Sequence, residues 1–193
     1  KVLLFGGSSP FSGFSLFSTL NDTWVFDQGN TGWASIDIPA SAKAPSGRNY
    51  HAMASLGEGK VVLFGGSSKP LSFLNDTWVF DQSNKGWASI DIPANAKAPS
   101  GRLGHAMASL GSGKVLLFGG SRTFFAMLNE TWVFSQSSKR WALIDIPSNA
   151  EAPPARFLLQ SDTYMSSLED GKVLLFDDAA SVVNLLTYAS SLI

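Results

Sequence analysis

The sequence predicts an all-β fold built from repeated four-stranded antiparallel sheets, and two observations predict it. First, the segment Asn-Asp-Thr-Trp-Val-Phe-Asp-Gln at 21–28 recurs unchanged at 75–82 and, with two substitutions, at 129–136. This repeat has a period of 54 residues. Second, the apolar runs are short enough for strands, end at Gly, Pro or polar residues, and show no helical periodicity. A fixed period of this kind indicates one structural unit copied along the chain.

Composition limits the classes of function. The chain has 193 residues, of which 45% are hydrophobic and 15% charged, and this suffices for one domain with a sizeable core. Its formal net charge of −1 argues against a nucleic-acid partner, which would require a basic surplus. No apolar run approaches the length of about 18 residues that membrane insertion needs. The absence of Cys excludes disulfides, cysteine nucleophiles and thiolate metal sites.

Each unit is expected to contain four short strands. In the second unit these strands are expected at 51–56, 61–64, 77–80 and 87–92. A Gly-rich hairpin turn at 57–59 separates the first two strands, and a polar turn at 82–86 separates the last two. Pro93 and Pro99 then mark the connection to the next unit.

Four antiparallel strands every 50 or so residues are typical of the blades of a β-propeller. We expect a single repeat region over 1–193, with a partial blade at 1–39, blades at 48–93 and 102–147, and a degenerate partial blade at 156–193. Because Lys1 already stands in a predicted strand, the sequence is expected to be a piece of something longer. An open arc of blades would expose apolar sheet faces, so we expect a longer chain or a homo-oligomer to complete the ring.

The residues that recur in every unit are expected to build the blades. Glycine doublets allow sharp turns where a Cβ would clash, tryptophans fill the space between sheets, and arginines are expected to bind carbonyls or carboxylates between blades. Catalysis requires different groups to converge on one atom, whereas these groups recur identically, so no catalytic residue is predicted. The set comprises Gly6, Gly7, Trp24, Trp33, Arg48, Gly65, Gly66, Trp78, Trp87, Arg102, Gly119, Gly120, Trp132, Trp141 and Arg156.

The two histidines, His51 and His105, stand 54 residues apart at equivalent positions. One hypothesis is that they line a central channel and share a metal ion. The alternative, which we favour, is that each histidine forms its bonds within its own blade, because neither has a further His or carboxylate at the spacing of a zinc site. No metal and no cofactor are therefore predicted.

The repeat resembles that of the kelch family over essentially the whole chain. Three features carry the resemblance: the Gly65-Gly66 doublet after an apolar strand, the pair Asp81 and Trp87, and a Pro-x-x-Arg-x-x-His string. That string occurs as Pro45, Arg48 and His51 and again as Pro99, Arg102 and His105. The fourth unit departs from the pattern, with Asp177-Asp178 in place of the glycines.

The resemblance implies a kelch-type β-propeller related to the galactose-oxidase-like central domain. The copper oxidase of this fold needs a Tyr cross-linked to Cys, so the lack of Cys rules that chemistry out here.

The loops between the second and third strands of each unit differ most between copies, and they are unusually apolar. They span 8–20, 67–74 and 121–128. Exposed apolar side chains gathered on one rim are typical of a partner-binding patch. The alternative is that they fold back over the blade edges. The candidate binding residues are Phe11, Phe14, Phe17, Leu71, Phe73, Phe124, Phe125 and Met127.

These patterns favour a non-catalytic scaffold that binds a protein or glycan partner through loops on one propeller face. Two alternatives remain open. The chain could be a fragment of a larger secreted or surface enzyme whose active site lies outside it, or a module of a structural array. Fold alone does not distinguish them, because function in propellers depends on the loops.

Overall fold

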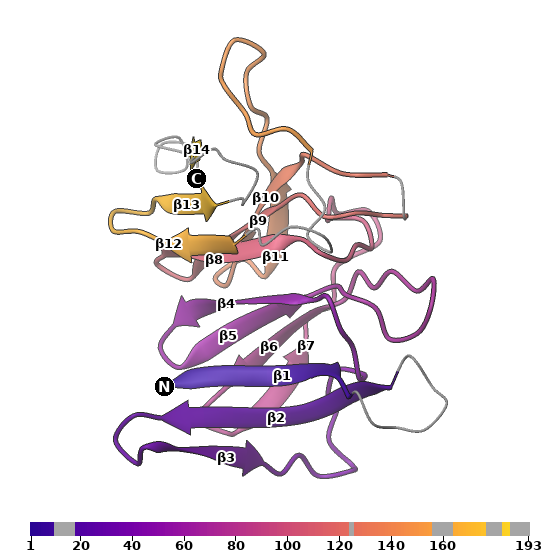
Figure 1. Ribbon diagram of the computed structural model, residues 1–193, viewed down its shortest axis with the longest axis vertical. Helices are drawn as coiled ribbons and strands as arrows, with labels where there is room; N and C mark the ends of the chain where they lie inside the picture. The colour runs from indigo at the N-terminus through magenta and orange to yellow at the C-terminus, as the bar shows by residue number, and fades with distance from the viewer. Residues whose placement is uncertain (10–17, 124–125, 156–163, 177–182, 186–193) are drawn as a thin grey trace.

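The computed structural model describes residues 1–9, 18–123, 126–155, 164–176 and 183–185. The strands of these residues form four antiparallel sheets that follow one another in chain order (Figure 1). The prediction of an all-β fold made of four-stranded antiparallel sheets is confirmed in the second and third sheets.

The second and third sheets have four strands each, with neighbouring strands paired in sequence order. The second sheet consists of β4 (Ala52–Gly57), β5 (Lys60–Phe64), β6 (Thr77–Asp81) and β7 (Gly86–Ser89). The third consists of β8 (Ala106–Gly111), β9 (Lys114–Phe118), β10 (Thr131–Ser135) and β11 (Arg140–Leu143).

The first and last sheets each show three strands among the described residues. The first sheet consists of β1 (Val2–Ser8), β2 (Thr19–Asp27) and β3 (Gly32–Ile36), in the order β1-β2-β3. The last consists of β12 (Tyr164–Ser167), β13 (Val173–Phe176) and β14 (Val183–Leu185). By position in the repeat, β1 corresponds to β5 and β9, and the first sheet shows no counterpart of β4 and β8.

Short-range chemistry fixes the turns. At the β4–β5 hairpin, Gly57 and Gly59 have φ angles of 85° and 72°, which glycine adopts without steric cost, and the register shifts after Ser55. At the β6–β7 turn, the carboxylate of Asp81 accepts a hydrogen bond of 2.9 Å from the backbone N–H of Ser83. These two turns lie at the same end of the sheet, because the N–H of Gln82 donates to the carbonyl of Gly59. We call this the turn end.

The opposite end of the sheets holds the β5–β6 and β9–β10 loops and the connections from one sheet to the next. Here the backbone N–H of Gly66 donates to the carbonyl of Arg102, at 2.9 Å, and the N–H of Arg102 donates to the carbonyl of Leu74. Gly65 and Gly66 have positive φ, and a Cβ on Gly65 would stand 2.7 Å from the Arg102 carbonyl oxygen. Only glycine therefore lets the loop approach the following connection, and we call this the loop end.

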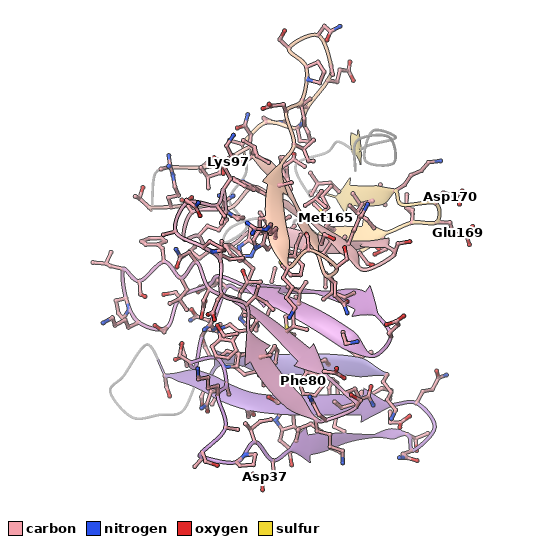
Figure 2. All side chains as sticks on the ribbon, turned by 180° about the vertical axis from the view of Figure 1, so that it is seen from behind. Asp37, Phe80, Lys97, Met165, Glu169 and Asp170 are labelled. Atoms are coloured by element: carbon pink, nitrogen blue, oxygen red, sulfur yellow. The ribbon has the colours of Figure 1, made fainter. Side chains whose placement is uncertain are left out.

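The core lies between consecutive sheets, as the alternation of side chains along each strand requires. Phe5 of the first sheet packs with Leu63, Phe80 and Trp87 of the second. The other face of the second sheet packs on the third, and Leu116 and Phe118 of the third pack on the last. Charged side chains such as Asp37, Lys97 and Glu169 lie at the periphery, whereas Phe80 lies among the strands (Figure 2).

Candidate interaction surface

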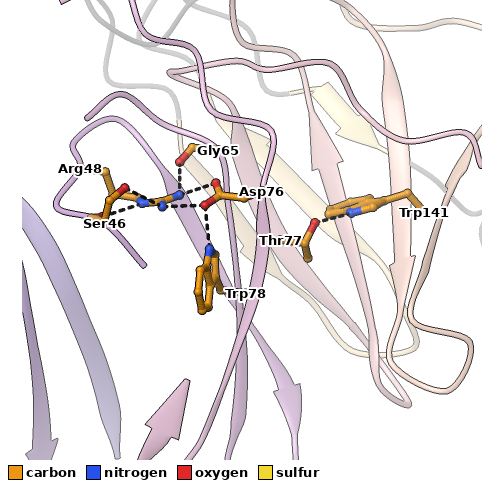
Figure 3. Close-up of polar contacts among 7 residues, drawn as sticks. All are labelled: Ser46, Arg48, Gly65, Asp76, Thr77, Trp78 and Trp141. Atoms are coloured by element: carbon orange, nitrogen blue, oxygen red, sulfur yellow. Dashed lines mark hydrogen bonds and ion pairs between the residues drawn. The ribbon is translucent and has the colours of Figure 1, made fainter. Parts of the chain in front are cut away.

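Two buried arginines organise the loop end. The guanidinium of Arg48 donates to the carbonyl of Gly65 at 3.0 Å and to both carboxylate oxygens of Asp76 at 2.7 and 2.8 Å (Figure 3). The indole N–H of Trp78 donates to the same carboxylate at 2.7 Å. Burial alone would raise the pKa of Asp76, but the hydrogen bonds and charge of Arg48 outweigh it, so the pKa is lowered. Arg48 thereby links the start of the β5–β6 loop, at Gly65, to Asp76 at the start of β6.

Arg102 repeats this arrangement in the third sheet, where it donates to the carbonyl of Gly119 at 3.0 Å and to Glu130 at 2.6 Å. The expectation that carbonyls or carboxylates between blades hold these side chains was wrong, because the guanidinium groups of Arg48 and Arg102 bind groups of their own sheet. Only the backbone of each arginine bonds to the loop of the preceding sheet, where the N–H of Arg48 donates to the carbonyl of Leu20 and that of Arg102 to the carbonyl of Leu74. Arg156, the third arginine of the set, lies outside the described residues.

Tryptophan side chains join neighbouring sheets. The indole N–H of Trp141 donates to the hydroxyl of Thr77 at 3.0 Å (Figure 3), and that of Trp87 donates to Thr23 at the same distance. Trp141 also meets the ring of Phe64 edge to face, with centroids 5.2 Å apart. Both tryptophans are buried. The tryptophan of one sheet thus bonds to a threonine of the preceding sheet and packs against a phenylalanine of that sheet.

The other tryptophans differ in exposure. Trp132 is buried, and Trp24 and Trp78 are half-buried. Trp33 departs from the expected packing, because its side chain is 51% exposed. Its equivalents Trp87 and Trp141 are covered by the preceding sheet, and no described sheet precedes the one that carries Trp33.

The two histidines also reach the preceding sheet. His51 meets the ring of Phe5 edge to face at 5.8 Å, and His105 meets Phe64 at 5.5 Å. The expectation that each would bond within its own blade was wrong, because each lies at the start of the first strand of its sheet, beside the preceding Gly-Gly loop. Among the described residues, neither histidine has a hydrogen-bond partner at its buried Nδ1.

Burial also governs the protonation of these histidines. Burial, and to a lesser degree the nearby charge of Arg102, lower the pKa of His105 to about 3. Burial and the charge of Arg48 similarly lower the pKa of His51 to about 4. Both rings are therefore neutral at physiological pH. The part of the chain that the structure describes contains no cluster of three or more potential metal-ligating side chains.

Three residues of the candidate patch, Leu71, Phe73 and Met127, are among the described residues and lie at the loop end. Leu71 is 72% exposed and Met127 is 52% exposed, whereas Phe73 is half-buried. The carbonyl of Phe73 lies against Gly101 of the following connection, where a Cβ would come within 2.3 Å of its oxygen. The remaining candidates lie outside the described residues; they are Phe11, Phe14, Phe17, Phe124 and Phe125.

Tyr50 is a surface residue that the sequence analysis missed. Its side chain is 50% exposed, and its φ of 56° is one that non-glycine residues rarely adopt. The equivalent residue of the next repeat is Gly104, whose N–H donates to the Tyr50 carbonyl at 2.9 Å. The signal was present in the sequence, as a Tyr where the following copy has Gly.

Two cations flank these apolar side chains. Lys69 and Arg122 are exposed on the β5–β6 and β9–β10 loops, respectively. The loop end thus presents aliphatic, aromatic and basic groups together. No helix among the described residues is long and apolar enough to span a membrane.

The chain matches a family model and parts of several known proteins. Residues 1–171 match the family model of the KLHDC2/KLHL20/DRC7 Kelch-repeats domain. Over 168 residues the chain is 27% identical to an F-box/kelch-repeat protein of Arabidopsis thaliana, covering 79% of this chain and 34% of that protein. Over 179 residues it is 29% identical to Adagio-like protein 1 of Oryza sativa subsp. japonica, covering 86% and 27%, respectively.

The chain is also similar to part of the dynein alpha chain of the flagellar outer arm of Chlamydomonas reinhardtii. The two are 28% identical over 160 residues, which cover 81% of this chain and 3% of the dynein. The chain therefore spans about a third or less of the length of these three relatives.

Proposed function

This chain belongs to the kelch-repeat family, and we propose that it is a non-catalytic interaction scaffold that binds a protein partner through the loop end of its sheets. The observation that carries the proposal is the exposure of Leu71 and Met127 on adjacent repeats, in loops whose ends are held by ion pairs between a buried arginine and a partly exposed carboxylate. An apolar side chain on a rigidly held loop loses little conformational entropy on binding and gains the free energy of burial.

A protein partner fits this surface better than a glycan. Tyr, Met and Arg are the side chains enriched at protein interfaces, and the loop end presents Tyr50, Met127 and Arg122. Methionine adapts its shape to an apolar contact. Lys69 and Arg122 would favour a partner with acidic groups around an apolar centre.

The polar residues of the repeat support a non-catalytic role. Arg48, Asp76 and Trp78 bond to one another, and the threonines of the first and second sheets bond to tryptophans of the following sheets. His105 is buried and neutral, so it cannot exchange protons with a bound substrate at the surface. The arginine, aspartate, threonine and tryptophan side chains thus form bonds within and between the sheets.

The test compares two variants that both replace exposed apolar residues by aspartate. Leu71→Asp with Met127→Asp changes the loop end, whereas Leu168→Asp changes the turn end, where Leu168 is exposed in the β12–β13 turn. A binding partner is first isolated with the unchanged protein and purified. Affinities are then measured by calorimetry, and melting temperatures are compared.

We expect the double variant to bind at least about 100-fold more weakly, because each lost apolar contact contributes about 1.5–3 kcal/mol. The melting temperature should stay within a few degrees of the unchanged protein, since neither side chain belongs to the core. Equal affinities of the double variant and Leu168→Asp would refute the proposal. Unfolding of the double variant would show that these loops cover the blade edges.

A further inference from the structure

Equivalent residues form a row across the turn end of each of the first three sheets. In the second sheet Lys60 pairs with Asp81, and Asp81 pairs with Gly86, so these residues stand side by side on β5, β6 and β7. Residues directly opposite one another on antiparallel strands project their side chains from the same face. The first sheet has the same row of lysine, aspartate and glycine, in which the amine of Lys1 lies 3.2 Å from the carboxylate of Asp27.

The third sheet keeps the lysine of this row but replaces the other two residues. Lys114 pairs with Ser135, and Ser135 pairs with Arg140, on the adjacent strands β9, β10 and β11 (Figure 1). The exchange removes a carboxylate from the centre of the row and adds a guanidinium beside it. Ser112 also stands where the second sheet has a further carboxylate, that of Glu58.

These exchanges leave the turn end of the third sheet without a negative charge. The segments 57–60 and 81–86 of the second sheet hold two cations and two carboxylates. The corresponding segments 111–114 and 135–140 hold Lys114, Lys139 and Arg140 and no carboxylate. Within the part of the chain that the structure describes, none of these three cations forms an ion pair. Because like charges repel, an anion bound among them would be stabilised.

The groups that bind the aspartate of the second sheet have counterparts in the third. In the second sheet the N–H and the hydroxyl of Ser83 donate to Asp81 at 2.9 and 2.7 Å. In the third sheet the hydroxyls of Ser135 and Ser137 lie 3.0 Å apart. The N–H of Ser137 has no hydrogen-bond acceptor among the described residues. An anion beside Ser135 would therefore receive donors from both hydroxyls and from this N–H, with a cation of the row on either side.

The second sheet shows that a following sheet leaves such a row accessible. Its row projects from the face that packs on the third sheet, because Val62, two residues along the strand from Lys60, lies in the core between these sheets. The side chains of Lys60 and Asp81 nevertheless remain 27% exposed each. In the third sheet Arg140 is exposed and Ser135 is half-buried. A ligand can therefore reach the row.

We propose that the row Lys114, Ser135 and Arg140 is a binding site for a phosphate monoester, separate from the loop-end surface. The phosphate oxygens take the place that the carboxylate of Asp81 has in the second sheet. A phosphate monoester carries a charge of about −1.5 to −2 and three strong acceptor oxygens. Two flanking cations, two hydroxyls and an N–H match this charge and these acceptors better than they match a single carboxylate. Lys139, in the adjoining turn, adds a third positive charge.

The experiment titrates the whole chain with inorganic phosphate and, separately, with a phosphoserine tripeptide flanked by glycines, at constant ionic strength. Calorimetry and the NMR signal of the Ser137 amide follow binding. Three variants each lower the net charge by one. Ser135→Asp and Arg140→Gly install the residues of the second sheet, which the fold accepts at these positions. Lys97→Gln removes an exposed cation outside the turn end and is the matched control.

We expect saturable binding of both phosphate probes and a shift of the Ser137 amide signal. Ser135→Asp and Arg140→Gly should each bind at least about tenfold more weakly, because the first places a carboxylate in the site and the second removes a charged donor. Lys97→Gln should bind as the unchanged chain does.

Two sources of the phosphate group are distinguished by the two probes. Tighter binding of the phosphopeptide would identify a phosphorylated polypeptide as the ligand, and equal binding would identify a free phosphate group; either result supports the site. Absence of saturable binding to the unchanged chain would overturn the proposal. So would a loss of affinity in Lys97→Gln equal to that in Arg140→Gly, since binding would then depend on net charge alone.

Discussion

The indole N–H of Trp141 donates a hydrogen bond of 3.0 Å to the hydroxyl of Thr77, 64 residues earlier in the chain and one sheet away. Trp87 and Thr23 repeat this relationship with the same separation. Threonine is therefore required at these two positions for its side chain, whose buried hydroxyl accepts the hydrogen bond of the neighbouring indole N–H.

Replacing Thr77 by valine should destabilise the protein by about 1–3 kcal/mol, because the buried indole N–H of Trp141 loses its acceptor. Thr131→Val is the matched control. The hydroxyl of Thr131 is buried but has no hydrogen-bond partner among the described residues, so its removal should be neutral or stabilising. Urea denaturation measures both changes. Equal losses in the free energy of unfolding for the two variants would show that the Trp141–Thr77 hydrogen bond contributes nothing to stability.

Equivalent tryptophans should differ in their contribution to stability. Trp141→Ala should cost about 3–5 kcal/mol, as for other buried aromatic residues. Trp33→Ala should cost far less, because half of its surface is already exposed. The free energies of unfolding of the two variants provide the test, and a cost for Trp33→Ala as large as that for Trp141→Ala would contradict the structure.

Arg48→Met should destabilise the protein by about 2–3 kcal/mol, since Asp76 and the Gly65 carbonyl lose their donor. This cost lies below the range of about 3–5 kcal/mol for fully buried pairs, because the Asp76 side chain is 35% exposed and can be hydrated. Lys60→Met is the control at a surface ion pair, where Lys60 lies 3.9 Å from Asp81, and should cost about 1 kcal/mol or less. Thermal unfolding of the two variants distinguishes these outcomes.

The buried histidines should make the fold sensitive to acid. Their folded pKa values of about 3 and 4 lie below the ordinary value of 6.5, so the unfolded chain binds protons more readily. Their contribution to stability is complete above pH 6.5 and is lost as the pH falls toward the folded pKa values. The loss is about 1.4 kcal/mol per pH unit for each histidine.

Between pH 6.5 and pH 5 the free energy of unfolding should therefore fall about half as much in His105→Leu as in the unchanged protein. The remaining fall is the contribution of His51. Measuring the free energy of unfolding at both pH values in the unchanged protein and the variant tests this. An unchanged pH dependence in His105→Leu would show that His105 is not neutral in the folded state, or that other groups dominate the titration.

Little of the candidate surface could be predicted with certainty from the sequence. The variable loops stood out because they were apolar, and Leu71 and Met127 are indeed exposed, but Phe73 is half-buried. Apolar character alone does not tell whether a loop side chain faces solvent or the neighbouring connection, because that depends on contacts such as the one between Phe73 and Gly101. Tyr50 was not singled out, because only the structure shows its exposure and its φ of 56°.

The sequence by itself determined the all-β fold, the repeat and the strands within it. Period, alternation and turn glycines act over a few residues, so they can be read from the chain directly. Only the tertiary structure decided how equivalent residues differ. Trp33 and Trp141 occupy the same position in their repeats, yet one is exposed and the other buried. Burial depends on whether another sheet lies against that face, and this is a contact between distant segments that local sequence does not encode.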